Sequence, residues 1–272
     1  MKISIQALME LAVIVHRHSG IVLKKNKAYL IENRLQPLME EYCLSSFEDL
    51  IARAKTSSQL ISRIVDLMTT NETSFFRDKR PFALLKETLL PDWQVNQEQK
   101  PGHLNIWSCA CATGQEVYSI AITLMAYFKG NFSSHNIKIK ASDISEAAIV
   151  KASRGLYTDY EVSRGLDSVQ LHKYFTREAP HWKIKDELRS MAYFEKMNLL
   201  QPDIAYKKFD IIFCRNVAIY FSKTDRRRLF HSLSACLKDN GALIIGATET
   251  LFDINEQLKR VDCGGTAYYC HK

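Results

Sequence analysis

Residues 107–122, WSCACATGQEVYSIAI, constrain the fold of this chain more than any other stretch. An apolar strand pattern ending at Trp107 runs into a turn of small residues around Gly114, and apolar residues then recur at helical spacing with Glu116 in the first turn. Open α/β sheets bind ligands beside such turns, at the carboxyl ends of their strands. The sequence therefore predicts an α/β fold with a binding site above Gly114.

A second apolar run, residues 137–141, is followed by Asp143. In nucleotide-binding sheets an acidic side chain at the end of the second strand accepts hydrogen bonds from ribose hydroxyls. The turn and this carboxylate together indicate a nucleoside cofactor. On these residues alone, an ordinary tight turn followed by a solvated aspartate stays open as the alternative.

The small residues of the turn narrow the class of cofactor. Ala110 and Ala112 stand where a pyrophosphate-binding G-x-G-x-x-G turn would have glycines, and no G-x-x-x-x-G-K-[ST] phosphate loop occurs. A dinucleotide, ATP and GTP are thus disfavoured. S-adenosylmethionine, which carries an adenosine but no phosphate, fits better.

The chain divides by pattern into a helical front and an α/β remainder. Helical spacing fills the first seventy or so residues, where Ser46 is a predicted cap and either Ser57 or Ser58 is another. After Pro81 come a helix, a polar linker at 94–102, and strands alternating with helices. We expect further strands at 209–213, 243–246 and 267–270.

Composition excludes several classes of protein. The chain has 272 residues, 46% of them hydrophobic, which is enough for a sizeable core. No apolar run approaches the ~20 residues of a membrane helix, and no secretion signal opens the sequence. The seven cysteines are an odd number scattered through apparent core segments, as expected for reduced thiols, and Cys109 and Cys111 lack the second ligand pair of a zinc site. We expect a cytoplasmic protein without metal or membrane insertion.

The formal net charge of +7 favours an acidic partner. A solvated basic helical face is the alternative. No aromatic base-stacking segment accompanies the basic residues, so nucleic acid is not the expected partner.

Four segments in order, 68–78 (MTTNETSFFRD), 107–122, 198–200 (NLL) and 209–221 (FDIIFCRNVAIYF), resemble the chemotaxis receptor methyltransferases of the CheR type. The resemblance implies a Rossmann-like class I SAM-dependent methyltransferase, with an open sheet that closes on an antiparallel edge strand. It implies a helical receptor-docking domain at 1–72 and a methyltransferase domain at 73–272. We expect a small inserted antiparallel β-subdomain at about 165–197.

The implied reaction moves a methyl group from S-adenosyl-L-methionine to receptor glutamates, giving methyl esters and S-adenosylhomocysteine. A glutamate is already ionised near neutral pH, so the site needs placement rather than a general base. A guanidinium holds a carboxylate in a fixed plane. The resemblance assigns this role to Arg77, with Arg215 as the alternative, and places Tyr220 beside the transferred methyl.

The same resemblance implies the cofactor contacts. Asn198 and Leu199 are expected to frame the adenine, and Asn216 and Val217 to line the methionine side. The full set of expected cofactor-binding residues is Asn71, Thr73, Arg77, Ala110, Gly114, Glu116, Asp143, Asn198, Leu199, Asn216 and Val217.

Three departures from the family pattern qualify these expectations. Ala110 puts a methyl where the backbone approaches the ligand, and Gln115 replaces a carboxylate. The predicted insert lacks the glycine-rich loop that holds a receptor's C-terminal pentapeptide. We therefore expect pentapeptide-independent recognition, in which Arg34, Arg53 and Arg63 meet the acidic methylation helices of a receptor.

Two other functions stay open. A non-catalytic docking protein is suggested by the altered turn, and a small-molecule methyltransferase is disfavoured by the separate basic helical domain. Cofactor binding separates the docking protein from both enzymes.

Overall fold

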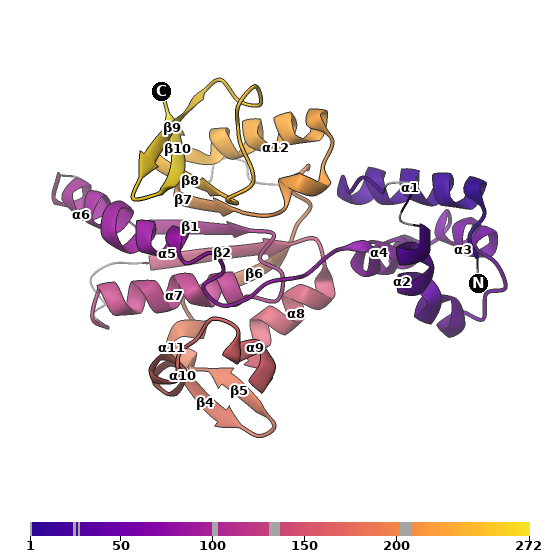
Figure 1. Ribbon diagram of the computed structural model, residues 1–272, viewed down its shortest axis with the longest axis horizontal. Coiled ribbons are helices and arrows are strands. Elements are labelled where there is room, and N and C mark those ends of the chain that lie inside the picture. The colour runs from indigo at the N-terminus through magenta and orange to yellow at the C-terminus, as the bar shows by residue number, and fades with distance from the viewer. Residues whose placement is uncertain (1, 24–25, 27, 100–102, 131–136, 202–207) are drawn as a thin grey trace. The chain divides into compact units, whose positions relative to one another are not determined.

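The computed structural model describes residues 2–23, 26, 28–99, 103–130, 137–201 and 208–272 (Figure 1). The chain forms two compact units. One comprises residues 1–70 with 220–226, and the other comprises residues 71–219 with 227–272. We refer to them as the helical unit and the sheet unit.

Four helices build most of the helical unit: α1 (Ile5–Ser19), α2 (Ala28–Glu41), α3 (Phe47–Ala54) and α4 (Ser58–Met68). Side-chain caps start three of them, because the hydroxyls of Ser4, Ser46 and Ser57 each accept an amide hydrogen from the first turn that follows. Gly20 ends α1 in the left-handed region, with φ of 76°. The predicted cap at Ser46 is confirmed, and Ser57 rather than Ser58 caps α4.

The apolar faces of these helices meet in one core. Its fully buried members recur at the helical spacing seen in the sequence. They include Leu11, Val15, Ile31, Leu35, Leu38, Phe47, Leu50, Leu60 and Ile64.

The three arginines that we expected to face a receptor have partners inside this unit. Arg34 donates to the carbonyls of Met68 and Thr69, both at 2.9 Å, and so satisfies the end of α4. Arg63 pairs with Glu41 through two hydrogen bonds, and the exposed Arg53 lies over the ring of Tyr42 at 5.0 Å. Arg34 therefore has a structural role that its sequence position did not indicate.

The sheet unit is centred on a seven-stranded sheet with the order β6-β2-β1-β7-β8-β10-β9. Neighbouring strands from β6 to β8 are parallel, whereas β10 is antiparallel to both β8 and β9. The strands are β1 (Leu104–Cys109), β2 (Ile137–Asp143), β6 (Ala192–Lys196), β7 (Phe209–Cys214), β8 (Leu237–Ile245), β9 (Leu258–Cys263) and β10 (Thr266–His271).

The sheet confirms the Rossmann-like α/β fold and differs from the sequence expectation at both edges. The antiparallel strand β10 lies second from one edge, since β9 lies outside it. At the other edge β6 belongs to the large sheet, although we expected residues 192–196 in the insert. Both missed strands are half-exposed edge strands, so their sequences lack the continuous apolar signal of a buried strand.

Helices cover both faces of this sheet. Figure 1 shows α7 (Gln115–Tyr127) and α12 (Lys223–Cys236) on opposite faces. A continuous helical run of α5 (Arg80–Leu84), a π-helical turn η2 (Leu85–Leu89) and α6 (Leu90–Gln99) packs in the same core as α7. The run extends through part of the predicted linker, whose residues 100–102 lie outside the described ranges.

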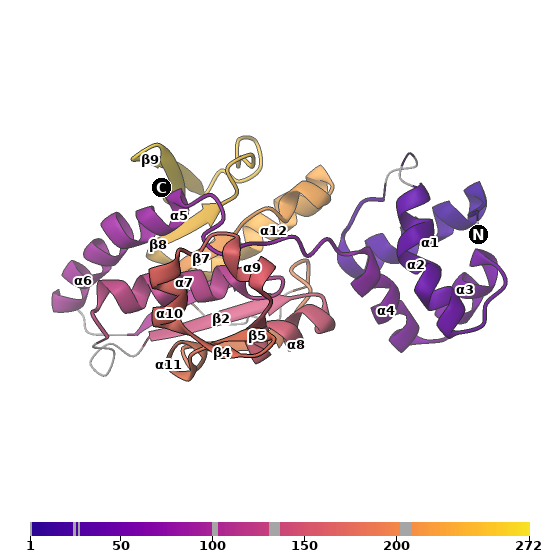
Figure 2. The same ribbon diagram turned by 60° about the horizontal axis from the view of Figure 1, so that its bottom comes forward.

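The expected small antiparallel sheet is present, with the order β3-β5-β4. Figure 2 labels two of its strands, β4 and β5. Its strands are β3 (Leu156–Tyr157), β4 (Phe175–Glu178) and β5 (His181–Ile184). It follows α8 (Glu146–Arg154) and is accompanied by α9 (Asp159–Ser163), α10 (Ser168–Tyr174) and α11 (Asp186–Arg189). Within the described part of the chain, no helix is long and apolar enough to cross a membrane.

Candidate functional site

The turn between β1 and α7 has an unusual backbone. Ala110 and Ala112 have φ of 53° and 48°, and Gly114 has φ of 94°. A non-glycine residue in the left-handed region costs about 1–2 kcal/mol. Gly114 cannot be replaced cheaply, because an added Cβ would lie 2.9 Å from Cβ of Ala152 and 3.0 Å from the hydroxyl of Tyr157. The two alanines thus hold a shape that glycine would adopt without strain.

Asp143 holds this turn from the end of β2. Its Oδ2 accepts the amide hydrogen of Ala112 at 2.8 Å, and its Oδ1 accepts that of Ser145 at 2.9 Å. Hydrogen bonds to an ionised group contribute about 1.5–3 kcal/mol, which is enough to offset the strain at Ala112. The carboxylate expected to bind ribose therefore fixes the backbone around the site, and its ribose contact remains a prediction.

The small sheet supports the same turn. Tyr157 is fully buried and donates its hydroxyl to the carbonyl of Thr113 at 2.9 Å. Burial raises the pKa of Tyr157 well above its ordinary value, so the hydroxyl stays a donor at any physiological pH. Sequence reasoning missed this residue, because the chain gives no local sign that β3 passes under the turn.

Glu116, in the first turn of α7, is engaged on both oxygens. Its Oε1 accepts from the hydroxyl of Ser108 and its Oε2 from Arg215, each at 2.8 Å. Arg215 follows β7 directly and its side chain is 2% exposed. Its Nη2 also donates to the carbonyl of Arg77 at 2.8 Å and to Asp78 at 2.7 Å. Arg215 therefore bonds other groups of the protein through both Nη atoms, and its alternative role toward an acceptor carboxylate stays an untested prediction.

The segment carrying Arg77 is anchored by its neighbours. Phe75 is buried and makes edge-to-face contacts with Tyr157 and Phe175, at 5.0 and 5.5 Å between ring centres. The amide of Phe76 donates to the hydroxyl of Ser119 at 2.9 Å. Arg77 itself is half-buried and donates from Nη1 to the carbonyl of Glu72 at 2.9 Å. The backbone of this segment is thus held in place, while the Arg77 guanidinium makes one hydrogen bond, to a neutral acceptor, within the described part of the chain.

The ends of β6 and β7 carry the other expected contacts. Asn198 and the buried Leu199 follow β6, and the amide of Leu200 donates to Asn198 Oδ1 at 3.0 Å. Asn216 follows Arg215 with φ of 57°, and the half-buried Val217 comes next. Since β6, β2, β1 and β7 are parallel, all these residues lie at one edge of the sheet.

Glu249, which sequence reasoning missed, holds Asn216 in place. Its Oε2 accepts the amide hydrogens of Asn216 at 2.8 Å and Gly246 at 2.7 Å, and so joins the carboxyl ends of β7 and β8. Its Oε1 is buried and has no hydrogen-bond partner among the described residues. An acidic residue shortly after a predicted strand was the one available signal.

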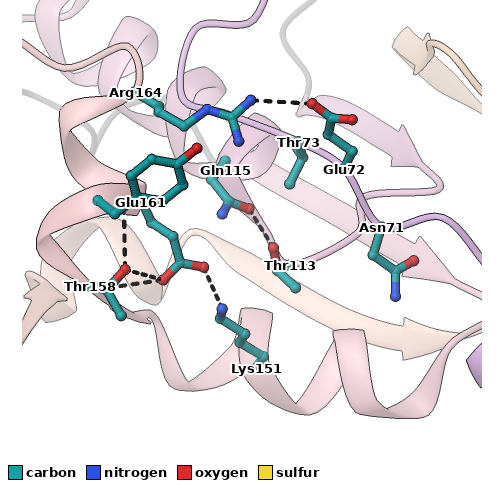
Figure 3. A pocket seen from close by; sticks show the side chains of 10 residues that line it. Asn71, Glu72, Thr73, Thr113, Gln115, Lys151, Thr158, Glu161 and Arg164 are labelled. Carbon is teal, nitrogen blue, oxygen red and sulfur yellow. Dashed lines mark hydrogen bonds and ion pairs between the residues drawn. The ribbon is translucent and has the colours of Figure 1, made fainter. Parts of the chain in front are cut away.

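A cavity of about 410 Å³ opens beside the turn (Figure 3). It contains the expected residues Asn71 and Thr73, but not Asp143, Asn198 or Asn216. Its lining comprises Asn71, Glu72, Thr73, Thr113, Gln115, Lys151, Thr158, Tyr160, Glu161 and Arg164.

Two ion pairs lie in this cavity, as Figure 3 shows. Arg164 meets Glu72 at 3.3 Å, and Lys151 meets Glu161, which also caps α9 with Thr158. Burial alone would raise the pKa of Glu161, but the hydrogen bonds from Lys151 and Thr158 outweigh it and hold the pKa below its ordinary value. Glu161 is therefore an anion near neutral pH.

Tyr220 belongs to the segment 220–226 that groups with the helical unit. Its carbonyl accepts the amide hydrogen of Val22 at 3.0 Å. Its proposed position beside the transferred methyl remains a prediction.

The cysteines near the turn are not reactive groups. Burial raises the pKa of both the Cys109 and Cys111 thiols well above the ordinary value, so neither is a thiolate at neutral pH. Among the described residues, no group of three or more His, Cys, Asp or Glu side chains could hold a metal ion.

The size of the cavity and the arrangement of the strand ends are suited to S-adenosyl-L-methionine. The cavity volume lies in the ~300–1,000 Å³ range of small-molecule sites, and the parallel strand ends surround the turn as they do in nucleoside-binding sheets. Glu249 Oε1, which has no partner within the described ranges, is a further acceptor at this edge. No cluster of lysines or glycines for phosphate lines the described cavity, in line with a phosphate-free cofactor.

Two family models match nearly the whole chain. The one described as "CheR methyltransferase, all-alpha domain" matches residues 6–69, and the one described as "CheR methyltransferase, SAM binding domain" matches residues 71–266. The resemblance and the cofactor inferred from the sequence are thereby confirmed.

Individual relatives agree with these matches. Chemotaxis protein methyltransferase 1 of Pseudomonas aeruginosa is 37% identical over 94% of this chain and 94% of that protein. Chemotaxis protein methyltransferase Cher2 of Pseudomonas putida is 36% identical, again over 94% of each chain. A chemotaxis protein methyltransferase of Vibrio anguillarum is 37% identical over 92% of this chain and 91% of that protein.

Proposed function

The chain belongs to the CheR methyltransferase family, and from that premise we propose that it methylates glutamate side chains of methyl-accepting chemotaxis receptors. The products are glutamyl methyl esters and S-adenosylhomocysteine. The names of the relatives support the link to chemotaxis. The observation that carries the choice of a carboxylate acceptor is the environment of Arg77: its backbone carbonyl is bonded by Arg215, while among the described residues its guanidinium bonds one neutral partner, the carbonyl of Glu72.

Bound S-adenosyl-L-methionine supplies an electrophilic methyl group on a sulfonium. In the proposal Asn198 and Leu199 hold its adenine, Asp143 its ribose, and the turn from Ala110 to Gly114 with Asn216 its methionine end. Asn71, Thr73, Glu116 and Val217 complete the proposed contacts.

Arg77 has the central proposed role toward the acceptor. A glutamate with an ordinary pKa of about 4.3 arrives ionised, so no residue has to remove a proton. A guanidinium orients the carboxylate in its own plane and leaves an oxygen lone pair free to attack. Correct placement of this kind contributes up to ~7–11 kcal/mol toward the barrier. Tyr220 is proposed to orient the same carboxylate through its hydroxyl.

We further propose that the helical unit docks on the acidic methylation helices of a receptor without a C-terminal pentapeptide tether. Arg53 and Arg63 are the candidate contacts, because both side chains are exposed to solvent. The short connection Ala179–Pro180 between β4 and β5 has no glycine-rich loop, which supports independence from the pentapeptide. The proposal keeps the expected cytoplasmic location, which the free thiols support.

The test is methyl transfer from labelled S-adenosyl-L-methionine to receptor fragments that keep or lack the terminal pentapeptide. Alkali-labile radioactivity on both fragments to similar extents is the expected result, because carboxyl methyl esters hydrolyse in base. Label on neither fragment, with cofactor binding intact, would exclude receptor glutamates as the acceptor.

Arg77→Ala should lower this transfer by roughly 100-fold or more, since the acceptor loses its orienting group. Arg177→Ala is the matched control, because Arg177 pairs with Asp159 on the small sheet. Near-normal turnover of Arg77→Ala would remove Arg77 from the mechanism.

One observation favours a second candidate, a docking protein without turnover. The strained backbone at Ala110 and Ala112 departs from the glycine pattern of the turn. Calorimetry with S-adenosylhomocysteine separates the two functions, because only the enzyme has to bind this product.

A further inference from the structure

We propose that Arg215 is a positioning residue that sets the conformation of residues 76–79, the loop carrying Arg77. It also links this loop to Glu116, which directly follows the cofactor turn at residues 110–115. The inference rests on the proposed function in one respect, the role of Arg77 toward the acceptor. Its structural part, the control of the loop by Arg215, stands on geometry alone.

The guanidinium of Arg215 joins three distant segments. It extends from the end of β7 and bonds Glu116 at the start of α7, 99 residues away. It also bonds the carbonyl of Arg77 and the carboxylate of Asp78, 138 and 137 residues away. The centre of the Phe82 ring lies 5.7 Å from its Cζ, at a distance typical of a cation–π contact. Arg215 is buried and Glu116 is largely buried, so breaking their pair would leave two charges with little access to water, whereas Asp78 is partly exposed.

The loop itself would not keep its shape without such support. Phe76, Asp78 and Lys79 have φ of 48°, 66° and 40°, all in the left-handed region. Each such residue costs about 1–2 kcal/mol, so the free segment would relax to other conformations. Arg215 donates hydrogen bonds to Arg77 and Asp78, the two residues in the middle of this strained segment. The direction of the Arg77 side chain therefore depends on Arg215.

The chemistry requires arginine at position 215. A planar guanidinium presents N–H groups in a fixed fork and can serve Glu116 with one nitrogen and the Arg77–Asp78 pair with the other. A lysine ammonium is a single point charge, and it would satisfy one side only. Arg215→Lys thus keeps the charge and removes the link between the two segments.

A double-mutant cycle tests the inference. Arg215→Lys in the otherwise unchanged protein should lower kcat by roughly 10- to 100-fold, because a misplaced orienting group costs that much. In the Arg77→Ala background the same change should cost about twofold or less, since the group it positions is gone. An equal fold-loss of kcat in both backgrounds would overturn the proposal, because a structural defect that does not act through Arg77 lowers kcat by the same factor whether or not Arg77 is present.

A readout that needs no turnover keeps this inference separate from the proposed function. Amide hydrogen exchange of residues 75–80 should become faster in Arg215→Lys, by at least tenfold, while exchange of α12 and β8 is unchanged. The milder Asp78→Asn should shift exchange in the same direction and serves if the lysine variant does not fold. Arg177→Lys is the matched control on the small sheet.

The two failures are distinguishable. Unaltered exchange at residues 75–80 in both variants would refute the role of Arg215 whatever the enzyme methylates. Faster exchange in a protein that transfers no methyl to receptor fragments would leave this role intact and refute the proposed acceptor.

Discussion

Arginines stabilise both units, but over very different distances in the sequence. In the helical unit, Arg34 reaches the last carbonyls of α4, two helices along the chain, and Arg63 meets Glu41 in the solvent. In the sheet unit, Arg215 is buried and holds segments about 100 or more residues away. The helical unit thus depends on helix periodicity and caps, whereas the carboxyl edge of the sheet depends on a few buried charges.

Both units place non-glycine residues in the left-handed region, since Cys43 of the helical unit has φ of 51°. Gly20 ends α1 there without strain, whereas the cofactor turn uses Ala110 and Ala112. Strain at a site of this kind persists because the surroundings determine it. Asp143 is the clearest determinant, through its bond to Ala112.

The largest expected effect of a small substitution is Gly165→Ala, beside the segment that leads to Arg77. Gly165 has φ of 114°, and an added Cβ would lie 1.9 Å from the carbonyl oxygen of Phe75. We expect a loss of about 3 kcal/mol or more in the free energy of unfolding, through overpacking and backbone strain together. Gly264→Ala, with φ of 53° and open space around it, should cost about 1 kcal/mol.

Urea unfolding followed by tryptophan fluorescence measures both variants, because Trp93, Trp107 and Trp182 all lie in the sheet unit. Equal losses at Gly165 and Gly264 would contradict the close approach to Phe75.

Arg34→Ala should destabilise the helical unit by about 1–2 kcal/mol, because it leaves carbonyls at the end of α4 without a donor. Far-ultraviolet circular dichroism reports the loss, while tryptophan fluorescence of the sheet unit should not change. Arg53→Ala is the matched change on the same unit and should stay within about 0.5 kcal/mol. If Arg34→Ala leaves the stability of the helical unit unchanged, Arg34 would again be a candidate for receptor docking.

The same substitution should have opposite signs in the two units. Ala110→Gly relieves a left-handed alanine and should raise the free energy of unfolding by about 0.5–1 kcal/mol. Ala52→Gly, at an exposed position of α3, should lower it by a similar amount, because glycine weakens a helix interior. Urea unfolding measures both changes in the free energy of unfolding. Changes of the same sign in the two variants would contradict the expected difference between the units.

The smallest effect concerns two carboxylates with lowered pKa. The pKa of Glu161 lies below its ordinary value of 4.5 in the folded chain, so its contribution to stability is full above about pH 4.5 and is lost as pH falls through the folded pKa. Glu161→Gln should remove the part of the stability loss at acid pH that comes from protonation of Glu161. The exposed Glu10, whose pKa is lowered chiefly by Lys55, is the comparison.

The salt dependence of stability distinguishes the contribution of Glu161 from that of Glu10. Added sodium chloride should screen the effect of Glu10→Gln more than that of Glu161→Gln, because the Glu10–Lys55 pair is the more exposed of the two. Thermal unfolding between pH 3 and pH 7, at low and high salt, gives the comparison. Equal salt sensitivity would mean that the cavity pair is as solvated as the surface pair.

The sequence predicts what is local. Caps at Ser46 and Ser57 and the spacing of Leu11 or Leu35 set the helices, and buried apolar runs set β1, β2 and β7. The half-exposed β6 and β9 lack such runs. Long-range charge pairing was not predictable, because nothing near Arg215 or Glu249 in the chain indicates partners that the fold alone brings close.

The central claim is that the strained turn at the carboxyl edge is an open S-adenosyl-L-methionine site. Calorimetric titration of the purified chain with S-adenosylhomocysteine tests it most directly, with circular dichroism and tryptophan fluorescence as controls for folding. The account predicts saturable one-to-one binding, and weaker binding in Asn198→Ala than in the unchanged protein. A folded protein that binds neither the product nor S-adenosyl-L-methionine would contradict the account and favour the docking protein.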